Sequence, residues 1–190
     1  MRVIAGTLRS RTLQAPAGLA TRPTSDRLRE TLFNVLGTEI AGAHFIDIFA
    51  GTGAVGIEAL SRGAAEVVFI EHHAPAAALI RKNLEALGIR GGATVLPSDA
   101  LRGLAMLAGR AESEPAFTHA FLDPPYADAL NYHRVLGYLA AAKFLGGHAV
   151  VIAEHRHSFQ SPEQVGALSR VRILRQGDAA LSFYRREPLR

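Results

Sequence analysis

The feature that most constrains the fold is a glycine-rich turn between an apolar segment and a helical one. Residues 44–49 are mostly apolar and predict a strand, and Gly51, Gly53 and Gly56 follow it at the spacing G-x-G-x-x-G. Residues 55–62 then favour a helix. Glycine permits a turn too tight for a Cβ atom, and a helix start directs free N–H groups and a positive dipole end at a ligand. The segment therefore predicts a cofactor-binding turn.

Two acidic residues beside this turn narrow the choice of cofactor. Glu71 follows the apolar run 67–70 and can bind two ribose hydroxyls, which indicates an adenosine-containing cofactor. Asp47 precedes the first glycine by four residues, where a carboxylate would be repelled by a pyrophosphate. S-adenosylmethionine has no phosphate and carries a sulfonium and an ammonium group, so Asp47 favours it over NAD. The alternative, that Asp47 only accepts hydrogen bonds from the turn, stays open.

The rest of the chain alternates between strand and helix patterns. Such alternation predicts an α/β fold with a doubly wound, mostly parallel sheet and an antiparallel last strand. Residues 2–8 and 11–14 predict a short N-terminal β-hairpin, so we expect an arm over 1–24 and one catalytic domain over 25–190. We predict helices over 25–36, 55–62, 74–87, 101–109 and 128–144, and strands over 44–49, 66–71, 93–97, 119–122, 148–154, 171–174 and 180–184.

Acidic residues recur where these strands end. Asp47, Glu71, Asp99 and Asp123 each lie at the end of a predicted strand. Ligands of such sheets bind at the carboxyl ends of the strands, and acidic residues are poor strand formers, so a shared site explains the recurrence better than packing does. We expect Asp99 to accept a hydrogen bond from the adenine amino group, with the Ala100 N–H nearby. The alternative for Asp99 is a helix N-cap.

The segment Asp123-Pro124-Pro125-Tyr126 suggests the chemistry. Two prolines withhold two N–H donors, so the strand end offers acceptors, the Asp123 carboxylate and the Pro124 carbonyl. Acceptors suit the exocyclic amine of a nucleobase: they would bind its protons and direct its lone pair at a methyl sulfonium, while Tyr126 stacks on the base. This pattern predicts in-line methyl transfer by positioning, without a metal. A rigid turn after a buried strand is the structural alternative.

The positive charge is concentrated near the N-terminus. Residues 1–30 contain six arginines and two acidic residues, a surplus equal to the formal net charge of the whole chain, +4. Guanidinium groups match phosphate oxygens, so the arm predicts contact with nucleic acid rather than a merely solvated face. The chain has no cysteine, signal peptide pattern or apolar run of the roughly 20 residues that a membrane span needs. We expect a cytoplasmic monomer.

Several of these segments resemble one family. Asp123 to Tyr126 looks like the D/N-P-P-Y/F motif of amino-group N-methyltransferases, and residues 2–13, 22–34 and 47–62 are similar to the bacterial 16S ribosomal RNA guanine-N2 methyltransferases, with a class I, Rossmann-like methyltransferase fold. His73 departs from that family, which more often has an acidic residue there. The resemblance implies that S-adenosylmethionine methylates one guanine N2 in 16S ribosomal RNA, on an assembling 30S subunit, with Thr24 and Arg29 near cofactor or substrate.

Together these patterns define a set of site residues and some alternatives. An adenine-N6 methyltransferase on DNA or RNA is the nearest alternative; an oxidoreductase or a non-catalytic RNA-binding module leaves the acidic strand ends or Asp123–Tyr126 unexplained. His155 and His157 alternate on one strand, but no third ligand is placed, so we predict no metal. We predict catalysis by Asp123, Pro124, Pro125 and Tyr126; cofactor binding by Thr24, Asp47, Phe49, Ala50, Gly51, Gly53, Gly56, Glu71, His72, Asp99, Ala100 and Asp123; and RNA binding by Arg2, Arg9, Arg11, Arg22, Arg27 and Arg29.

Overall fold

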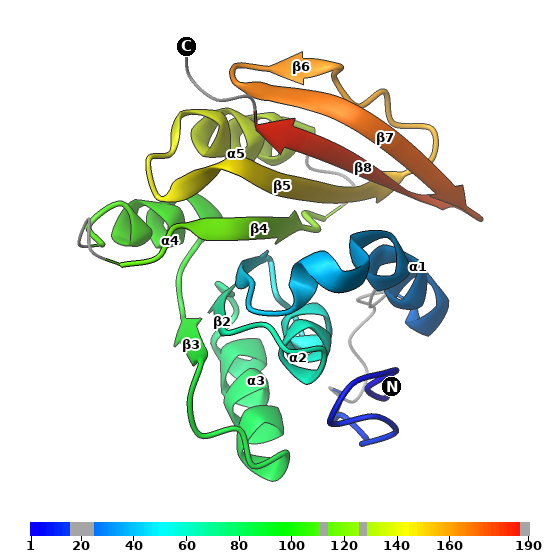
Figure 1. Ribbon diagram of the computed structural model, residues 1–190, viewed down its shortest axis with the longest axis vertical. Coiled ribbons are helices and arrows are strands. Elements are labelled where there is room, and N and C mark those ends of the chain that lie inside the picture. The colour runs from blue at the N-terminus through cyan, green and yellow to red at the C-terminus, as the bar shows by residue number, and fades with distance from the viewer. Residues whose placement is uncertain (16–24, 111–113, 126–128, 187–190) are drawn as a thin grey trace.

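An eight-stranded sheet forms the centre of the computed structural model, which describes residues 1–15, 25–110, 114–125 and 129–186 (Figure 1). The strands lie in the order β3-β2-β1-β4-β5-β8-β7-β6. Their bounds are β1 His44–Ile48, β2 Glu66–Ile70, β3 Ala93–Leu96, β4 Phe117–Leu122, β5 Leu145–Arg156, β6 Gln164–Val165, β7 Leu168–Gln176 and β8 Ala179–Arg186. The chain reverses direction across the sheet between β3 and β4, which creates a switch point beside β1.

Strand directions confirm the predicted fold class. The pairs β1–β2, β2–β3, β1–β4 and β4–β5 are parallel, whereas β8 pairs antiparallel with both β5 and β7. The antiparallel last strand thus lies inside the sheet, between β5 and β7. The short strand β6 continues the sheet beyond β7 and was not predicted, because two residues are too few to give a sequence pattern.

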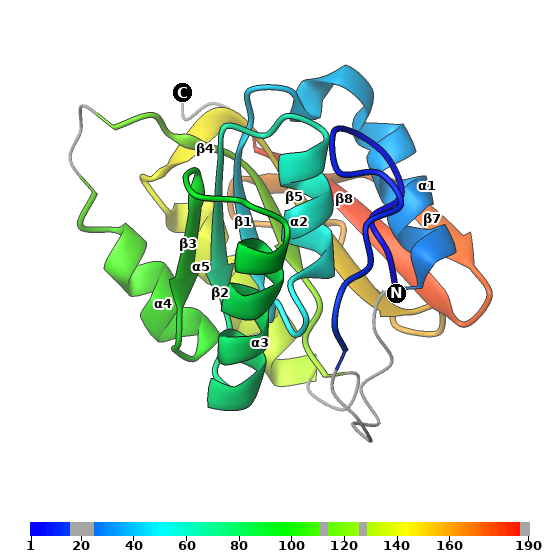
Figure 2. The same cartoon turned by 90° about the horizontal axis from the view of Figure 1, so that it is seen from below.

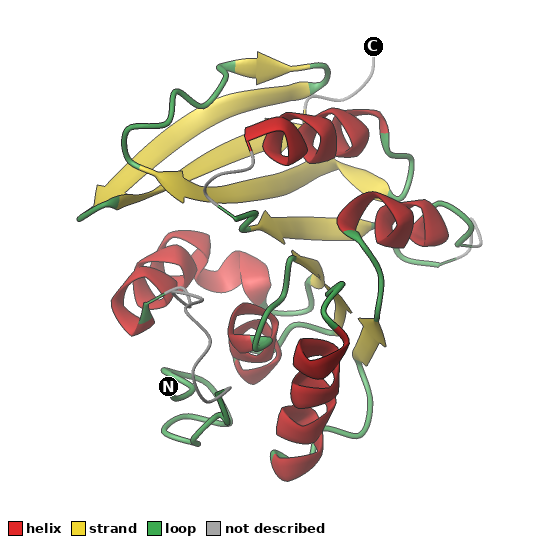
Figure 3. Cartoon of the chain, turned by 180° about the vertical axis from the view of Figure 1, so that it is seen from behind, coloured by secondary structure: helices red, strands yellow, loops and turns green. Residues whose placement is uncertain are grey.

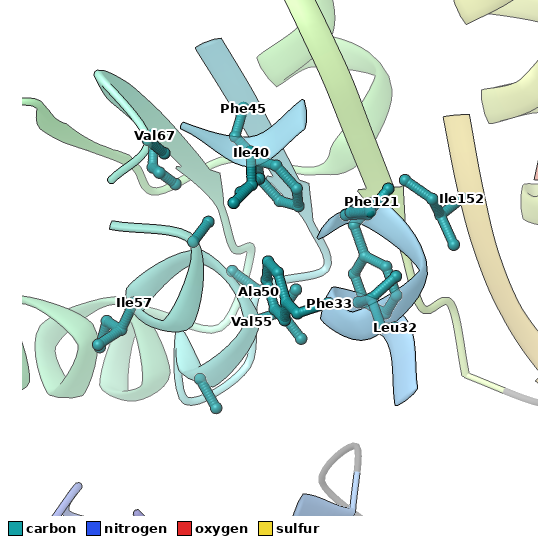
Figure 4. Packing of buried hydrophobic residues seen from close by; sticks show 14 of the residues in the cluster. Leu32, Phe33, Ile40, Phe45, Ala50, Val55, Ile57, Val67, Phe121 and Ile152 are labelled. Atoms are coloured by element: carbon teal, nitrogen blue, oxygen red, sulfur yellow. The ribbon is translucent and has the colours of Figure 1, made fainter. Parts of the chain in front are cut away.

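Helices cover both faces of the sheet. The helices α1 (Asp26–Leu36), α2 (Ala54–Ser61) and α3 (Ala74–Ala86) share one core with the sheet, and α4 (Ala100–Leu107) and α5 (Ala129–Ala141) share the other. Figure 3 shows α5 lying across the antiparallel end of the sheet from behind. In Figure 4, Leu32 and Phe33 of α1 meet Phe121 of β4 and Ile152 of β5. The parallel pairing of Ile48 with Leu122 places the carboxyl ends of β1 and β4 side by side.

The helix starts follow local rules. Ser25 caps α1, accepting a hydrogen bond from the Leu28 N–H at 3.1 Å. Gly37 ends α1 with φ of +53°, and a single 3₁₀ turn, η1 (Gly37–Ile40), leads into β1. Gly53 is the N-cap of α2 with φ of +76°, so the last glycine-turn residue before the helix adopts the left-handed conformation.

The N-terminal arm is a compact loop attached to α2 rather than a regular hairpin. Its pairing consists of one bridge, Arg2 to Thr12, with Val3 and Leu13 buried in the core beside α2 (Figure 2). The Thr7 N–H donates to the Ser61 carbonyl at 2.7 Å. Gly6 has φ of +81°, and a Cβ there would lie 1.8 Å from the same carbonyl oxygen. Docking on α2, rather than strand pairing, therefore determines this part of the arm.

The helices that the structure describes are too short or too polar to cross a membrane.

Candidate functional site

The glycine turn has the close backbone approach that its sequence predicts. Phe49 has φ of +63°, a strained value for a residue with a side chain, and Gly51 has φ of +55°. A Cβ at Gly56 would lie 2.3 Å from the Phe69 ring, so the glycine lets α2 pack closely on β2. The buried Ala50 donates its N–H to the Ile70 carbonyl at 3.0 Å, which ties the turn to β2. These contacts hold the turn against β2, at the carboxyl ends of the strands.

Asp47 is buried beneath this turn. Its side chain is 2% exposed, and its Oδ2 accepts a hydrogen bond from the Gly56 N–H at 2.9 Å. Burial raises the pKa of Asp47 to about 8, against the lowering effect of the Gly56 bond and with a further increase from Glu71. The capping role left open by the sequence is thus real. A carboxyl held at so high a pKa is also one whose ionisation a bound cation would favour.

Glu71 connects the ends of β1 and β2. Its Oε2 accepts the Gly51 N–H at 2.8 Å, and its Oε1 accepts the His73 N–H at 2.7 Å. The exposed His72 ring lies 3.3 Å from Oε1. A carboxylate has about four acceptor positions, so Glu71 can accept further hydrogen bonds of the kind that ribose hydroxyls donate. The structure thus brings Asp47, Glu71 and the glycine turn together.

Asp99 lies at the same edge and caps α4. Its Oδ1 accepts the Arg102 N–H at 3.0 Å, so the capping alternative is realised, while the carboxylate remains exposed. The neighbouring Ser98 donates its N–H to the Glu71 carbonyl at 3.1 Å. Its hydroxyl oxygen is buried and has no hydrogen-bond partner among the described residues. A buried polar atom without a partner is a candidate ligand-binding group that the sequence analysis missed.

Asp123 ends β4, the strand next to β1. Its N–H donates to the Ile48 carbonyl at 3.4 Å, and its side chain is partly buried. Burial raises the pKa of Asp123 well above its ordinary value, and the neighbouring carboxylates of Glu154 and Asp47 raise it further. The buried Pro124 and exposed Pro125 follow without N–H donors. This strand end is thus rich in hydrogen-bond acceptors.

The combined chemistry of the edge fits a cationic cofactor with a ribose. The carboxyl groups of Asp47 and the buried Glu154 both lie close enough to Asp123 to raise its pKa. Such a group of acids would repel a pyrophosphate, whereas a sulfonium and an ammonium group would relieve their mutual repulsion. Glu154 was not predicted as a site residue, although it ends the predicted strand 148–154 just as the other acidic residues end their strands. The residues present therefore suit S-adenosylmethionine.

Asn83 of α3 is a further buried residue that the sequence analysis missed. Its Nδ2 donates to the Thr52 carbonyl in the glycine turn at 3.3 Å, and its Oδ1 accepts the Gln14 N–H at 2.9 Å. The side chain thus joins the arm to the cofactor turn. An amide on the buried face of an amphipathic helix was the signal that could have identified it.

The predicted RNA-binding arginines differ in their exposure to solvent. Arg2, Arg9, Arg11 and Arg27 are exposed, as a phosphate contact requires. Arg29 is fully buried, which is incompatible with the predicted contact. Its guanidinium donates to the Arg2 carbonyl and lies 3.0 Å from Asp26 and 3.7 Å from Glu58. The prediction for Arg29 is wrong because a count of charges cannot tell an exposed arginine from one paired across the fold.

Glu58 of α2 organises this buried cluster. Its carboxylate accepts the N–H groups of Ile4 and Ala5 at 2.8 and 3.0 Å and lies 2.7 Å from Arg62. We expect Glu58→Ala to lower the free energy of unfolding by about 3–5 kcal/mol, because it removes one of the two carboxylates beside the buried Arg29 and leaves two backbone N–H groups without an acceptor. Urea denaturation measures the change.

A matched control separates burial from charge in that experiment. Glu85 of α3 is exposed, and we expect Glu85→Ala to change the free energy of unfolding by less than about 0.5 kcal/mol. Equal effects of the two substitutions would contradict the buried role of Glu58.

Some residues singled out by the sequence are not part of the arrangement described above. Thr24, Arg22 and Tyr126 lie outside the described residues. His155 is buried and bonded to the Ser182 hydroxyl at 2.8 Å, whereas His157 is exposed. Within the described ranges, no group of three or more histidine and acidic side chains has an arrangement suited to a metal ion.

Known proteins are similar to this chain in sequence, in fold or in both. The chain is 35% identical to ribosomal RNA small subunit methyltransferase D of Escherichia coli K12, over 98% of this chain and 90% of that protein. The structure of a hypothetical protein from Thermus thermophilus matches all of this chain and 99% of that one, with 29% identity and a TM-score of 0.81. An RNA methyltransferase from Salinibacter ruber, in complex with S-adenosyl-L-homocysteine, shares the fold at 14% identity and a TM-score of 0.63, over 88% of this chain and 95% of that one.

A family model spans nearly the whole chain. Residues 1–185 match the family described as conserved hypothetical protein 95. The match includes the arm, the glycine turn and the segment after β4, which are the parts that build the candidate site. The chain belongs to this family, together with the relatives named ribosomal RNA small subunit methyltransferase D.

Proposed function

We propose that this protein transfers a methyl group from S-adenosylmethionine to the exocyclic N2 amine of a guanine in 16S ribosomal RNA, on an assembling small subunit. The observation that carries the proposal is the position of Asp123. It lies at the end of β4 beside Asp47, and the prolines after it offer acceptors without donors. An exocyclic amine, which has protons to donate, is the group that this strand end suits.

The predicted cofactor-binding residues support S-adenosylmethionine as the methyl donor. The carboxyl of Asp47 suits the ammonium end of S-adenosylmethionine, and Glu71 has acceptor positions for the ribose hydroxyls. Asp99 and the Ala100 N–H suit the adenine edge. When bound, the cofactor supplies an electrophilic methyl group on a sulfonium. We propose Phe49, Ala50, Gly51, Gly53, Gly56 and His72 as the remaining cofactor contacts.

In the proposed mechanism, the protein positions the target amine for methyl transfer, and no metal takes part. Two hydrogen bonds from the amine, to the Asp123 carboxylate and the Pro124 carbonyl, would hold its lone pair in line with the methyl group. The same bonds would favour the tetrahedral nitrogen that forms in the transition state. Tyr126 would stack on the flipped base.

Ribosomal RNA is the substrate that the relatives' names and the arm favour. The Escherichia coli relative is named for the small-subunit ribosomal RNA. In this chain, the exposed Arg2, Arg9 and Arg11 form a basic surface on the docked arm. The described residues include no inserted domain for reading duplex DNA, so selectivity through the shape of a folded RNA suits the protein better.

Transfer of labelled methyl groups tests the substrate class. Methyl-labelled S-adenosylmethionine would be incubated with small ribosomal subunits from cells lacking the activity, with naked 16S RNA, and with duplex DNA. We expect label in the ribosomal RNA and none in the DNA. Label in DNA alone would contradict the proposal and favour the adenine-N6 alternative.

A further inference from the structure

Glu154 lies near the carboxyl end of β5, the strand next to β4. Leu122 of β4 is opposite Ala153 of β5, so Asp123 and Glu154 follow at the same level on neighbouring strands. Adjacent strands lie about 5 Å apart. Glu154 is only 3% exposed. The register thus places a second, buried carboxyl side chain one strand spacing from Asp123 at the carboxyl edge of the sheet.

The two acidic side chains also share a face of the sheet. Phe121 of β4 and Ile152 of β5 both belong to the core packed against α1 (Figure 4). Side chains alternate along a strand, so Asp123 and Glu154, each two residues further on, point to this same face. The Asp123 N–H still donates to β1, so the strand geometry extends to it. Leu181, which is opposite Glu154 on β8, belongs to the same core.

The predicted cofactor residues lie on the other side of Asp123. Asp47, Glu71 and Asp99 come from the ends of β1, β2 and β3, which lie on one side of β4 in the sheet order. The strand β5 lies on the other side of β4. Glu154 therefore borders the side from which the substrate, rather than the cofactor, reaches Asp123.

Two neighbouring carboxyl groups suit a ligand with two neighbouring hydrogen-bond donors. The carboxylate of Glu154 raises the pKa of Asp123, because like charges repel, and a ligand that donates to both groups would relieve this repulsion. An ionised carboxylate only accepts hydrogen bonds, at about four positions. Guanine presents its N2 amine beside the N1–H on its Watson–Crick edge, whereas the N6 amine of adenine lies beside a bare N1, which is an acceptor. A second carboxylate beside Asp123 therefore suits guanine.

We propose that Glu154 accepts the N1–H of the target guanine while Asp123 accepts a proton of its N2 amine, so that Glu154 selects guanine over adenine. This inference rests on the proposed function and deepens it, because it names the residue that selects the base. Adenine would set the lone pair of its N1 against the Glu154 carboxylate. Two acceptors would then face each other in a buried site without a proton between them, which is costly.

The test varies the target base and the acidic residue together. Small subunits would be reconstituted with 16S RNA that has guanine, 2-aminopurine or adenine at the position that the parent protein methylates. 2-Aminopurine keeps the 2-amino group but has no proton on N1. Glu154→Gln keeps the size of the side chain, and its amide can donate to a bare N1 as well as accept from N1–H. The control Glu85→Gln removes the same charge from an exposed position of α3.

We expect the parent protein and Glu85→Gln to prefer guanine over 2-aminopurine by about 10²-fold or more in kcat/KM. Glu154→Gln should reduce that preference by about 10–100-fold, because it slows the reaction of guanine and not that of 2-aminopurine. Glu154→Asp, which keeps an acceptor-only carboxylate, should retain the preference for guanine at a lower rate. Calorimetric titration with S-adenosylmethionine should give the parent affinity for all three variants, which also shows that they are folded.

A purely structural role of Glu154 would slow the reaction of every base equally. An unchanged preference in Glu154→Gln would therefore overturn the inference and leave methylation of guanine N2 standing. If Glu154→Gln does not fold, a parent preference for guanine below about fivefold still overturns the inference. A parent protein that methylates adenine N6 and no guanine would overturn the inference together with the proposed function.

Discussion

Replacement of Asp123 by alanine should reduce the rate constant of methyl transfer, measured at saturating S-adenosylmethionine, by about 10³-fold or more. Alanine removes the carboxylate that would accept a proton of the target amine, an interaction that strengthens in the transition state. Single-turnover methylation of small subunits measures the rate, and calorimetric titration with S-adenosylmethionine measures the affinity. A variant that binds the cofactor and keeps more than a tenth of the parent rate would contradict the role of Asp123.

Asparagine at the same position separates hydrogen bonding from proton removal. Asparagine keeps an acceptor oxygen, so Asp123→Asn should lose only about 10–100-fold if Asp123 acts as an acceptor. Because burial and the carboxylates of Glu154 and Asp47 raise the pKa of Asp123, the parent rate should rise with pH as this group ionises. That rise should be absent from the asparagine variant; a persistent rise would assign the titration to another group.

Replacement of Asp47 by asparagine should have opposite effects on stability and on cofactor binding. The pKa of Asp47 is about 8 in the folded protein against an ordinary 3.8, so the free energy of unfolding falls as pH rises from about 4 to about 8. Asparagine removes that loss and still accepts the Gly56 N–H. We expect Asp47→Asn to be more stable by about 2–4 kcal/mol at pH 9 and little changed at pH 4.

The same substitution should weaken S-adenosylmethionine binding by roughly 10–100-fold, because a charge-assisted hydrogen bond to the ammonium group is lost. Binding near pH 7 should also release a proton from Asp47 in the parent protein and none from this group in the variant. Calorimetry in buffers of different ionisation enthalpy measures the release. As a stability control, Asp99→Asn keeps a cap of equal quality and should unfold like the parent. A variant that binds the cofactor normally would limit Asp47 to its capping role.

Local patterns predicted the elements of the site well. The strands β1 and β2, which present Asp47 and Glu71, begin at the predicted residues and end within one residue of the prediction. Their boundaries are sharp because apolar runs stop at glycine or acidic residues. The Ser25 cap and the Gly53 turn also depend on residues within a few positions of each other. Such signals are contained in a short window of sequence.

The errors come from contacts between distant segments. The predicted strand 148–154 is β5, which begins earlier, at Leu145, and includes Gly146 and Gly147, although glycine is a weak strand former. Pairing with β4 overrides that local preference: Phe117 is opposite Leu145. Helix α5 accordingly ends at Ala141, before the predicted residue 144.

Arg29 shows most clearly what could not be predicted from the sequence. Its neighbours in the chain are typical of a basic arm, yet its partner Glu58 is on another helix and the Arg2 carbonyl is in the arm. Only the folded chain shows that this arginine holds the arm in place. The arrangement of Ser98, Asn83 and Glu154 around the strand ends has the same origin, since each depends on a residue from another element.

The identity of the methylated nucleoside tests the central claim most directly. Ribosomal RNA labelled by the parent protein and by Asp123→Ala would be digested to nucleosides and separated by chromatography with mass detection. The account predicts N2-methylguanosine at one site from the parent protein and none from the variant. N6-methyladenosine, or label that survives in Asp123→Ala, would contradict it.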